Sequence, residues 1–168
     1  TKALTVRTRE AFPVDWARTQ NNLGNAYSNR IRGERADNLE QAIRCYTEAL
    51  TVCTREAFPE QWAGTQNNLG VAYELQGQID KAITEYQEAI QLDPDLTSPH
   101  YNLGLVYYAQ GQIEQAIAEW EEVVRLDPNH PNAHKNLGVA YSELDRAAEA
   151  LAEFEIYLQL APDAPDRA

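Results

Sequence analysis

The chain has 168 residues, of which 43% are hydrophobic and 24% charged, a composition typical of a globular rather than a disordered protein. Its 14 Lys and Arg residues against 26 Asp and Glu residues give a net charge of −12. So acidic a surface repels phosphates, and no run of about 18 apolar residues occurs, so we expect no nucleic-acid partner and no membrane partner or span.

The charge is distributed unevenly along the chain. Residues 1–62 hold nine basic and eight acidic residues, whereas residues 63–168 hold five basic and 18 acidic residues. The two halves are therefore expected to face different surroundings. The chain also begins at Thr1 and contains no Met, and we expect it to be part of a longer protein.

The two cysteines, Cys45 and Cys53, are eight residues apart and follow no metal-ligand or disulfide-framework spacing. We expect them to be inert thiols on one face of one helix, in a reducing cytoplasm.

Four copies of a short motif divide the chain into repeating units. They are NNLGNAY at 21–27, NNLGVAY at 67–73, YNLGLVY at 101–107 and KNLGVAY at 135–141, and their leucines are separated by 46, 34 and 34 residues. A second segment follows each motif, as EQAIRCYTEAL does at 40–50. Apolar residues recur at three- and four-residue spacing in both segments, which predicts two helices in each unit.

Breaks separate these predicted helices. Gly77 and Gly111 stand where first helices should end, and Pro94 and Pro128 follow second helices. In chain order the expected helices are 1–11, 15–31, 37–56, 61–76, 79–92, 96–110, 113–126, 131–143 and 147–160.

The spacing of the Leu-Gly pair, the following Tyr, the later Ala and aromatic, and the closing Pro resembles the tetratricopeptide repeat (TPR) over nearly the whole chain. The resemblance implies an all-α fold, a right-handed solenoid of about nine antiparallel helices with a concave groove. The expected divisions are a half repeat at 1–12, a long repeat at 13–60, and further repeats at 61–96, 97–130 and 131–168.

The 46-residue unit is longer in its inter-helix loop, Asn29–Asn38, and is expected to be longer in its second helix. This unit resembles the long-helix variant of kinesin light chains and of many bacterial signalling proteins, so we expect a fragment of a bacterial protein. Residues 1–29 match residues 47–75 at 21 of 29 places, so residues 1–11 are predicted to be the second helix of a preceding unit.

In the family that the chain resembles, first helices line the groove and hold peptides. Carried over by motif position, the expected peptide-binding residues are Arg18, Asn21, Asn25, Asn67, Tyr101, Leu105, Tyr108 and Lys135. Asparagine both donates and accepts, so it can pair with the backbone of an extended peptide; alternatively these side chains satisfy neighbouring groups. The tyrosines either anchor a ligand side chain or pack against the next unit.

Other polar residues are expected to have structural roles. One asparagine precedes the Leu-Gly pair in every unit (Asn22, Asn68, Asn102 and Asn136), which favours a structural hydrogen bond. The arginines of the first loop, Arg30, Arg32 and Arg35, indicate a solvated loop more than an anion site. Equivalent histidines, His100 and His134, lack the carboxylate spacing of a metal site.

No nucleophile, metal or nucleotide motif occurs. The resemblance implies a protein-interaction module whose partner is a protein or peptide, and without these motifs we expect no enzymatic activity, cofactor or metal. The alternative is a scaffold that assembles with copies of itself, head to tail, through unfinished solenoid ends.

Overall fold

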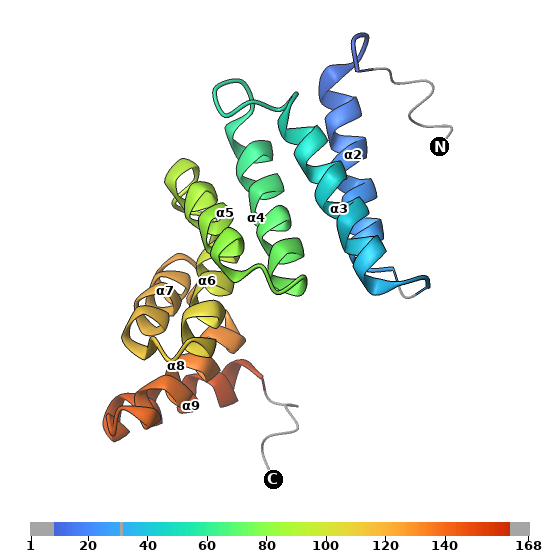
Figure 1. Ribbon diagram of the computed structural model, residues 1–168. Helices are drawn as coiled ribbons and strands as arrows, with labels where there is room; N and C mark the ends of the chain where they lie inside the picture. The colour runs from blue at the N-terminus through green and yellow to red at the C-terminus, as the bar shows by residue number, and fades with distance from the viewer. Residues whose placement is uncertain (1–8, 31, 162–168) are drawn as a thin grey trace. The chain divides into compact units, whose positions relative to one another are not determined.

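The computed structural model describes residues 9–30 and 32–161, which are helical and contain no strand (Figure 1). The eight helices, in chain order, are α2 (Pro13–Ser28), α3 (Arg35–Leu50), α4 (Pro59–Leu75), α5 (Ile79–Leu92), α6 (Thr97–Ala109), α7 (Ile113–Leu126), α8 (Pro131–Glu143) and α9 (Ala147–Leu160). The predicted all-α class is confirmed, and the predicted bounds of four helices, 79–92, 113–126, 131–143 and 147–160, agree with the structure.

The chain folds as two compact units, the first ending at Pro94 and the second beginning at Asp95. In the first unit α2 packs on α3, α3 on α4, and α4 on α5; α2 also contacts α4. In the second unit α6 packs on α7, α7 on α8, and α8 on α9. Each unit therefore contains two successive helix pairs, with a core between each helix and its neighbour in sequence.

Each helix pair is fixed by an aromatic ring that lies against a glycine. A Cβ atom placed on Gly24 would stand 2.5 Å from a ring atom of Tyr46, and one on Gly104 would stand 2.4 Å from Nε1 of Trp120. Tyr86 covers Gly70 and Phe154 covers Gly138 in the same way. The missing side chain thus makes room for a ring, so the glycine sets the separation of the two helices.

The turns within the pairs depend on the left-handed backbone conformation. Gly77 and Gly111 have φ of 77° and 74°, as the sequence predicts for residues that end a first helix. The fourth repeat has Asp145 at the matching place, with φ of 57°. Asp tolerates this conformation better than most residues, so the same turn forms without glycine.

The prediction that the second helix of the long unit runs to residue 56 is wrong. Helix α3 ends at Leu50, and Cys53 lies beyond it, so the two cysteines do not share a helix. Thr51, Val52 and Thr54 are β-branched and lower helix propensity here. Pro59 then starts α4, and the residue before a proline is disfavoured in helical geometry.

The predicted helix at 1–11 lies mostly outside the described residues, and its described part, residues 9–11, forms a turn. The repetition of sequence nevertheless produces repetition of geometry. Phe12, before Pro13, has φ −141° and ψ 65°, and Phe58, before Pro59, has φ −144° and ψ 64°. The same residues therefore start α2 and α4 in the same way.

Candidate functional site

The first-helix surface of the first unit carries the predicted asparagines. Asn21 on α2 accepts a hydrogen bond at Oδ1 from Nδ2 of Asn68 on α4, at 3.1 Å. This bond joins two first helices that also contact each other. Asn68 thus has the structural role predicted for it, and the bond employs the oxygen of Asn21 rather than its amide hydrogens.

Asn25 contributes to the fold more than its sequence position suggests. Its Oδ1 accepts a hydrogen bond of 2.7 Å from the hydroxyl of Tyr46, the ring that covers Gly24. Burial raises the pKa of Tyr46 to about 12, so the hydroxyl stays a donor at neutral pH. The side chain of Asn25 is half-buried, and a contact between Asn25 and a peptide stays a prediction.

Arg18 and Asn67 complete the predicted set in this unit. Arg18 is exposed and lies 3.6 Å from a carboxylate oxygen of Asp15, one turn earlier on α2. Asn67 is half-buried on α4. The first unit therefore places three carboxamides and one guanidinium on α2 and α4, and their role as ligand contacts stays a prediction.

In the second unit the predicted aromatic residues pack against the core between repeats while keeping part of their surface exposed. Tyr101, Leu105 and Tyr108 are half-buried beside the cluster that contains Trp120 and Leu137. The ring centroids of Tyr108 and Trp120 are 5.7 Å apart. The Tyr108 hydroxyl also donates to the Glu143 carboxylate on α8, and this hydrogen bond raises the pKa of Tyr108. These residues combine a packing role with exposed surface.

Two further contacts position this surface. The hydroxyl of Tyr101 accepts from Nδ2 of Asn136 at 3.3 Å, the counterpart of the bond from Asn68 to Asn21 in the first unit. The Nζ atom of Lys135 lies 5.6 Å from the centroid of the Tyr157 ring, a cation–π contact. The structural role predicted for the repeated asparagine is thus confirmed for Asn68 and Asn136.

Sequence reasoning missed a buried polar position common to all four repeats. Gln20, Gln66, His100 and His134 are each less than a tenth exposed. Each faces a carboxylate on the second helix of its own pair: Gln20 Nε2 donates to Glu48 and Gln66 Nε2 donates to Glu88, both at 2.7 Å. His100 Nδ1 lies 2.6 Å from Glu119, and His134 Nδ1 lies 2.6 Å from Glu153. The shared 19-residue separation of the two His–Glu pairs was the available signal.

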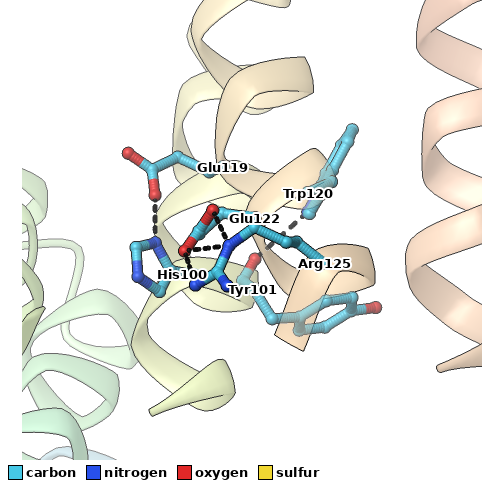
Figure 2. A network of polar contacts seen from close by, with 6 residues as sticks. All are labelled: His100, Tyr101, Glu119, Trp120, Glu122 and Arg125. Carbon is cyan, nitrogen blue, oxygen red and sulfur yellow. Dashed lines mark hydrogen bonds and ion pairs between the residues drawn. The ribbon is translucent and has the colours of Figure 1, made fainter. Parts of the chain in front are cut away.

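Figure 2 shows the third repeat, where this pair belongs to a larger network between α6 and α7. Nε1 of Trp120 donates to the backbone oxygen of Tyr101 at 3.2 Å. Arg125 forms two short bonds to Glu122, from Nε at 2.8 Å and from Nη2 at 2.6 Å. These bonds hold the pKa of Glu122 below its usual value. Both carboxylates of this network, Glu119 and Glu122, therefore have a basic partner.

In the second repeat the carboxylate Glu85 is not balanced by its neighbours in this way. Burial, and then the charge of Glu88, raise the pKa of Glu85 to about 7; the nearby amide of Gln66 and the charge of Lys81 oppose the rise. Glu85 stands where the third repeat has Glu119. The same backbone position thus holds a carboxylate beside a histidine in the third repeat and a carboxylate with a raised pKa in the second.

The remaining predicted features have structural roles in the described residues. Cys45 and Cys53 are buried free thiols, and burial raises the pKa of each. Arg35 donates to the Ser28 backbone oxygen at 2.8 Å, and the loop arginines are exposed.

Within residues 9–30 and 32–161 no group of three or more His, Cys, Asp or Glu side chains could hold a metal ion. In the same residues every helix is too short or too polar to pass through a bilayer.

Profiles of known families match most of the chain. A TPR repeat profile matches residues 70–111 and 104–145, and a tetratricopeptide repeat profile matches residues 16–50. These matches agree with the helix pairs and with the glycine–aromatic contacts in the structure. No curated protein sequence matches the chain.

Solved structures share the fold. A crystal structure of MamA is 24% identical, covers 92% of this chain and 82% of its own, and superposes with a TM-score of 0.73. The crystal structure of YrrB, a TPR protein with an unusual peptide-binding site, is 21% identical, covers 92% of this chain and 73% of its own, and gives a TM-score of 0.66. At these identities the likeness establishes the fold, and together with the family profiles it shows that the chain belongs to the tetratricopeptide repeat family.

Proposed function

We propose that the chain is a protein-interaction module that binds an extended peptide or partner segment on its first-helix surface and catalyses no reaction. Three findings support this function: membership of a family of interaction repeats, the carboxamides on α2 and α4, and the partly exposed tyrosines on α6. The observation that carries the proposal is the hydrogen bond between Asn68 and Asn21, because it fixes two adjacent first helices while leaving amide donors to a ligand.

The proposed contact is backbone recognition. The Asn21 oxygen is engaged by Asn68, so the Asn21 amide hydrogens donate to a peptide carbonyl. Asn67, on the neighbouring first helix, offers a second carboxamide. Each such bond between neutral groups contributes about 0.5–1.5 kcal/mol net. Recognition of this type is tolerant of ligand sequence, and specificity then depends on pockets for side chains.

The aromatic surface of the second unit, formed by Tyr101 and Tyr108, is the proposed contact for a ligand side chain. Tyr101 and Tyr108 keep part of their rings exposed although both are braced by neighbours, Tyr101 by His130 at 5.0 Å between ring centroids and Tyr108 by Trp120. Rings held in one orientation lose little freedom on binding, so they suit an apolar ligand side chain. The acidic second half of the chain favours a neutral or mildly basic peptide.

A test of this proposal begins with a bound segment identified by affinity capture and mapped to a synthetic peptide. Replacing Asn21 and Asn67 together by Ala should weaken binding of that peptide by roughly five- to a hundredfold if the two contributions add. Calorimetric titration measures the loss, which should persist at high salt because the contact is between neutral groups.

Thr47→Ala, an exposed substitution on the second helix α3, is the matched control and should bind as the parent does. Normal binding by the doubly substituted chain, with its fold intact by circular dichroism, would refute backbone recognition by these asparagines.

A second candidate function is assembly with copies of the same chain, and one contrast favours it. Ile117 on α7 is 5% exposed because α8 covers it, whereas Leu151, at the matching place on α9, is 60% exposed. A face that is buried in one repeat is thus open in the next. Size measurements over a concentration series separate the candidates: growth without ligand supports assembly, and a monomer at all concentrations excludes it.

A further inference from the structure

The first unit contains an open cleft on a different set of residues from those predicted to bind peptides. It has a volume of about 400 Å³ and is lined by α3, by the end of α4 and by the start of α5. This volume lies within the usual range of ligand clefts, about 300–1,000 Å³. Its apolar part consists of Ile43 and Tyr73, which are both half-buried.

The second unit shows how the same place looks when it is closed. Ile117 and Tyr141, which correspond by repeat to Ile43 and Tyr73, are each 5% exposed. Leu144 packs in the same cluster, and the Tyr141 hydroxyl donates to Glu121 at 2.6 Å. In the closed version, apolar contact and an internal hydrogen bond complete the junction between successive repeats.

Four of the seven lining residues differ from those of the closed counterpart: Arg44, Gln76, Gln78 and Lys81 stand where the other unit has Ala118, Leu144, Arg146 and Glu149. Gln76 replaces the apolar Leu144, and Arg44 replaces the small Ala118. Gln76 thus puts a polar side chain where the other unit has the packed Leu144, whereas Arg44 adds a guanidinium at a place that is exposed in both units. The half-buried surface of Ile43 and Tyr73 therefore stays accessible. An uncovered apolar surface bordered by amide and guanidinium groups is suited to a ligand with both apolar and polar parts.

The charges around the cleft indicate the sign and the size of the ligand's charge. Arg44 and Lys81 are exposed, and neither forms an ion pair with a described residue. Lys81 Nζ lies 5.1 Å from the centroid of the Tyr73 ring, which holds the cation over the apolar part. Glu40 also lines the cleft, so its three charged lining groups sum to one positive charge. Glu85 lies near enough to interact with Lys81 and Tyr73, but burial raises its pKa to about 7, so it carries only part of a negative charge at neutral pH. Such a balance complements one carboxylate better than a polyanion.

We propose that this cleft binds a peptide segment in which an aliphatic residue is followed by an acidic one. The aliphatic side chain lies against Ile43 and Tyr73, and the carboxylate accepts from the guanidinium of Arg44 and from Lys81. Gln78 Nε2 donates to Gln76 Oε1, so the Gln76 amide hydrogens and the Gln78 oxygen are the groups that pair with the peptide backbone. An extended polyanion is disfavoured because the chain as a whole carries a net charge of −12.

The experiment titrates the ¹⁵N-labelled chain with capped six-residue peptides of sequence Ser-Gly-X-Glu-Gly-Ser, where X is Leu, Ile, Val or Phe. Matched peptides carry Gln in place of Glu. We expect the acidic peptides to shift the Arg44 side-chain signal and the amide signals of Gln76 and Gln78, and the Gln peptides to bind roughly tenfold more weakly.

Three variants sharpen the result. Arg44→Ala should weaken binding roughly tenfold, and Gln76→Leu, which introduces the residue of the closed counterpart, should abolish it. Arg44 is exposed on a helix and Ala is a good helix former, so the first variant should stay folded. The Asn21→Ala and Asn67→Ala double variant should bind as the parent does, which separates this cleft from the first-helix surface.

Equal binding of the Glu and Gln peptides would overturn the proposal, as would unchanged binding by Arg44→Ala. Signal changes confined to α2 and to Asn67 would also overturn it and would instead favour the proposed first-helix surface.

Discussion

The second and third repeats place different chemistry at one position of the same scaffold. In the second, Gln66 donates to Glu88, its own Oε1 is buried without a hydrogen-bond partner among the described residues, and Glu85 has a raised pKa. In the third, His100 lies against Glu119, and Arg125 binds Glu122. The glycine under the aromatic ring is the same in both.

This difference separates what defines the fold from what adjusts its stability. The glycine–aromatic contact occurs in all four pairs, so it specifies how two helices pack. The buried polar position varies between Gln and His, so it adjusts how strongly each pair is held. Substitution of the shared glycine should therefore disturb the packing of any pair, whereas the effect of substituting the buried polar residue should differ between the two units.

The largest expected effect comes from breaking what the repeats share. Gly104→Leu would place a side chain where Trp120 lies, since even a Cβ atom would stand 2.4 Å from its Nε1. Overpacking costs about 1–3 kcal/mol, and more where the ring cannot move, so we expect a loss of at least about 3 kcal/mol. Chemical denaturation measures it. Gly64→Ala, at a helical glycine with open space around its Cβ, is the control. An unchanged midpoint for Gly104→Leu would disprove the role given to the ring.

A smaller loss should follow removal of the histidine in the fourth repeat. His134 is 3% exposed; Nδ1 lies 2.6 Å from Glu153 and Nε2 lies 3.0 Å from the backbone oxygen of Pro128. Both partners are oxygen acceptors, so each ring nitrogen lies against an oxygen. His134→Leu leaves two acceptors unpaired and should cost about 2–3 kcal/mol. His134→Gln keeps an amide donor that can reach Glu153 and should cost about 1 kcal/mol. Equal losses in thermal melts would contradict this interpretation.

The smallest effect concerns Glu85 and depends on pH. Its pKa is about 7 in the folded chain against an ordinary value of 4.5, so the folded state favours the protonated carboxyl. The associated stability is complete below about pH 4.5 and is lost as the pH rises to about 7. Glu85→Gln should therefore raise stability at pH 8 by about 1–2 kcal/mol, after allowance for solvent screening, and leave it nearly unchanged at pH 4.5.

Stability curves of both proteins across this pH range provide the measurement for Glu85. A gain that does not depend on pH would exclude burial of the charge as its cause. Glu56→Gln, at an exposed residue, should change little at any pH.

Much of the fold could be predicted because it is repeated and local. Apolar spacing, Gly77, Gly111 and the prolines define most helices without knowledge of their neighbours. The end of α3 could not be predicted by extending its pattern, because β-branched residues and the start of α4 at Pro59 override that pattern.

The candidate site was harder to predict, because it depends on the positions that side chains from other helices take in the folded chain. The oxygen of Asn25 accepts a hydrogen bond from the hydroxyl of Tyr46, and that bond depends on how the Tyr46 ring packs against Gly24. The exposure of Ile43 compared with Ile117 depends on Gln76 and Leu144, which directly follow the last residue of the next first helix. Sequence position alone names candidates, and packing then decides which atoms remain accessible.

The burial of Trp120 makes each unit separately observable. Trp120 is 1% exposed in the second unit, whereas Trp16 and Trp62 are half-buried in the first. Indole emission shifts to longer wavelength when the ring meets water, so the blue edge of the fluorescence reports the second unit and the red edge the first. Arrays of repeats can unfold in stages, and the chain therefore contains an intrinsic optical probe of whether its two units unfold together or one after the other.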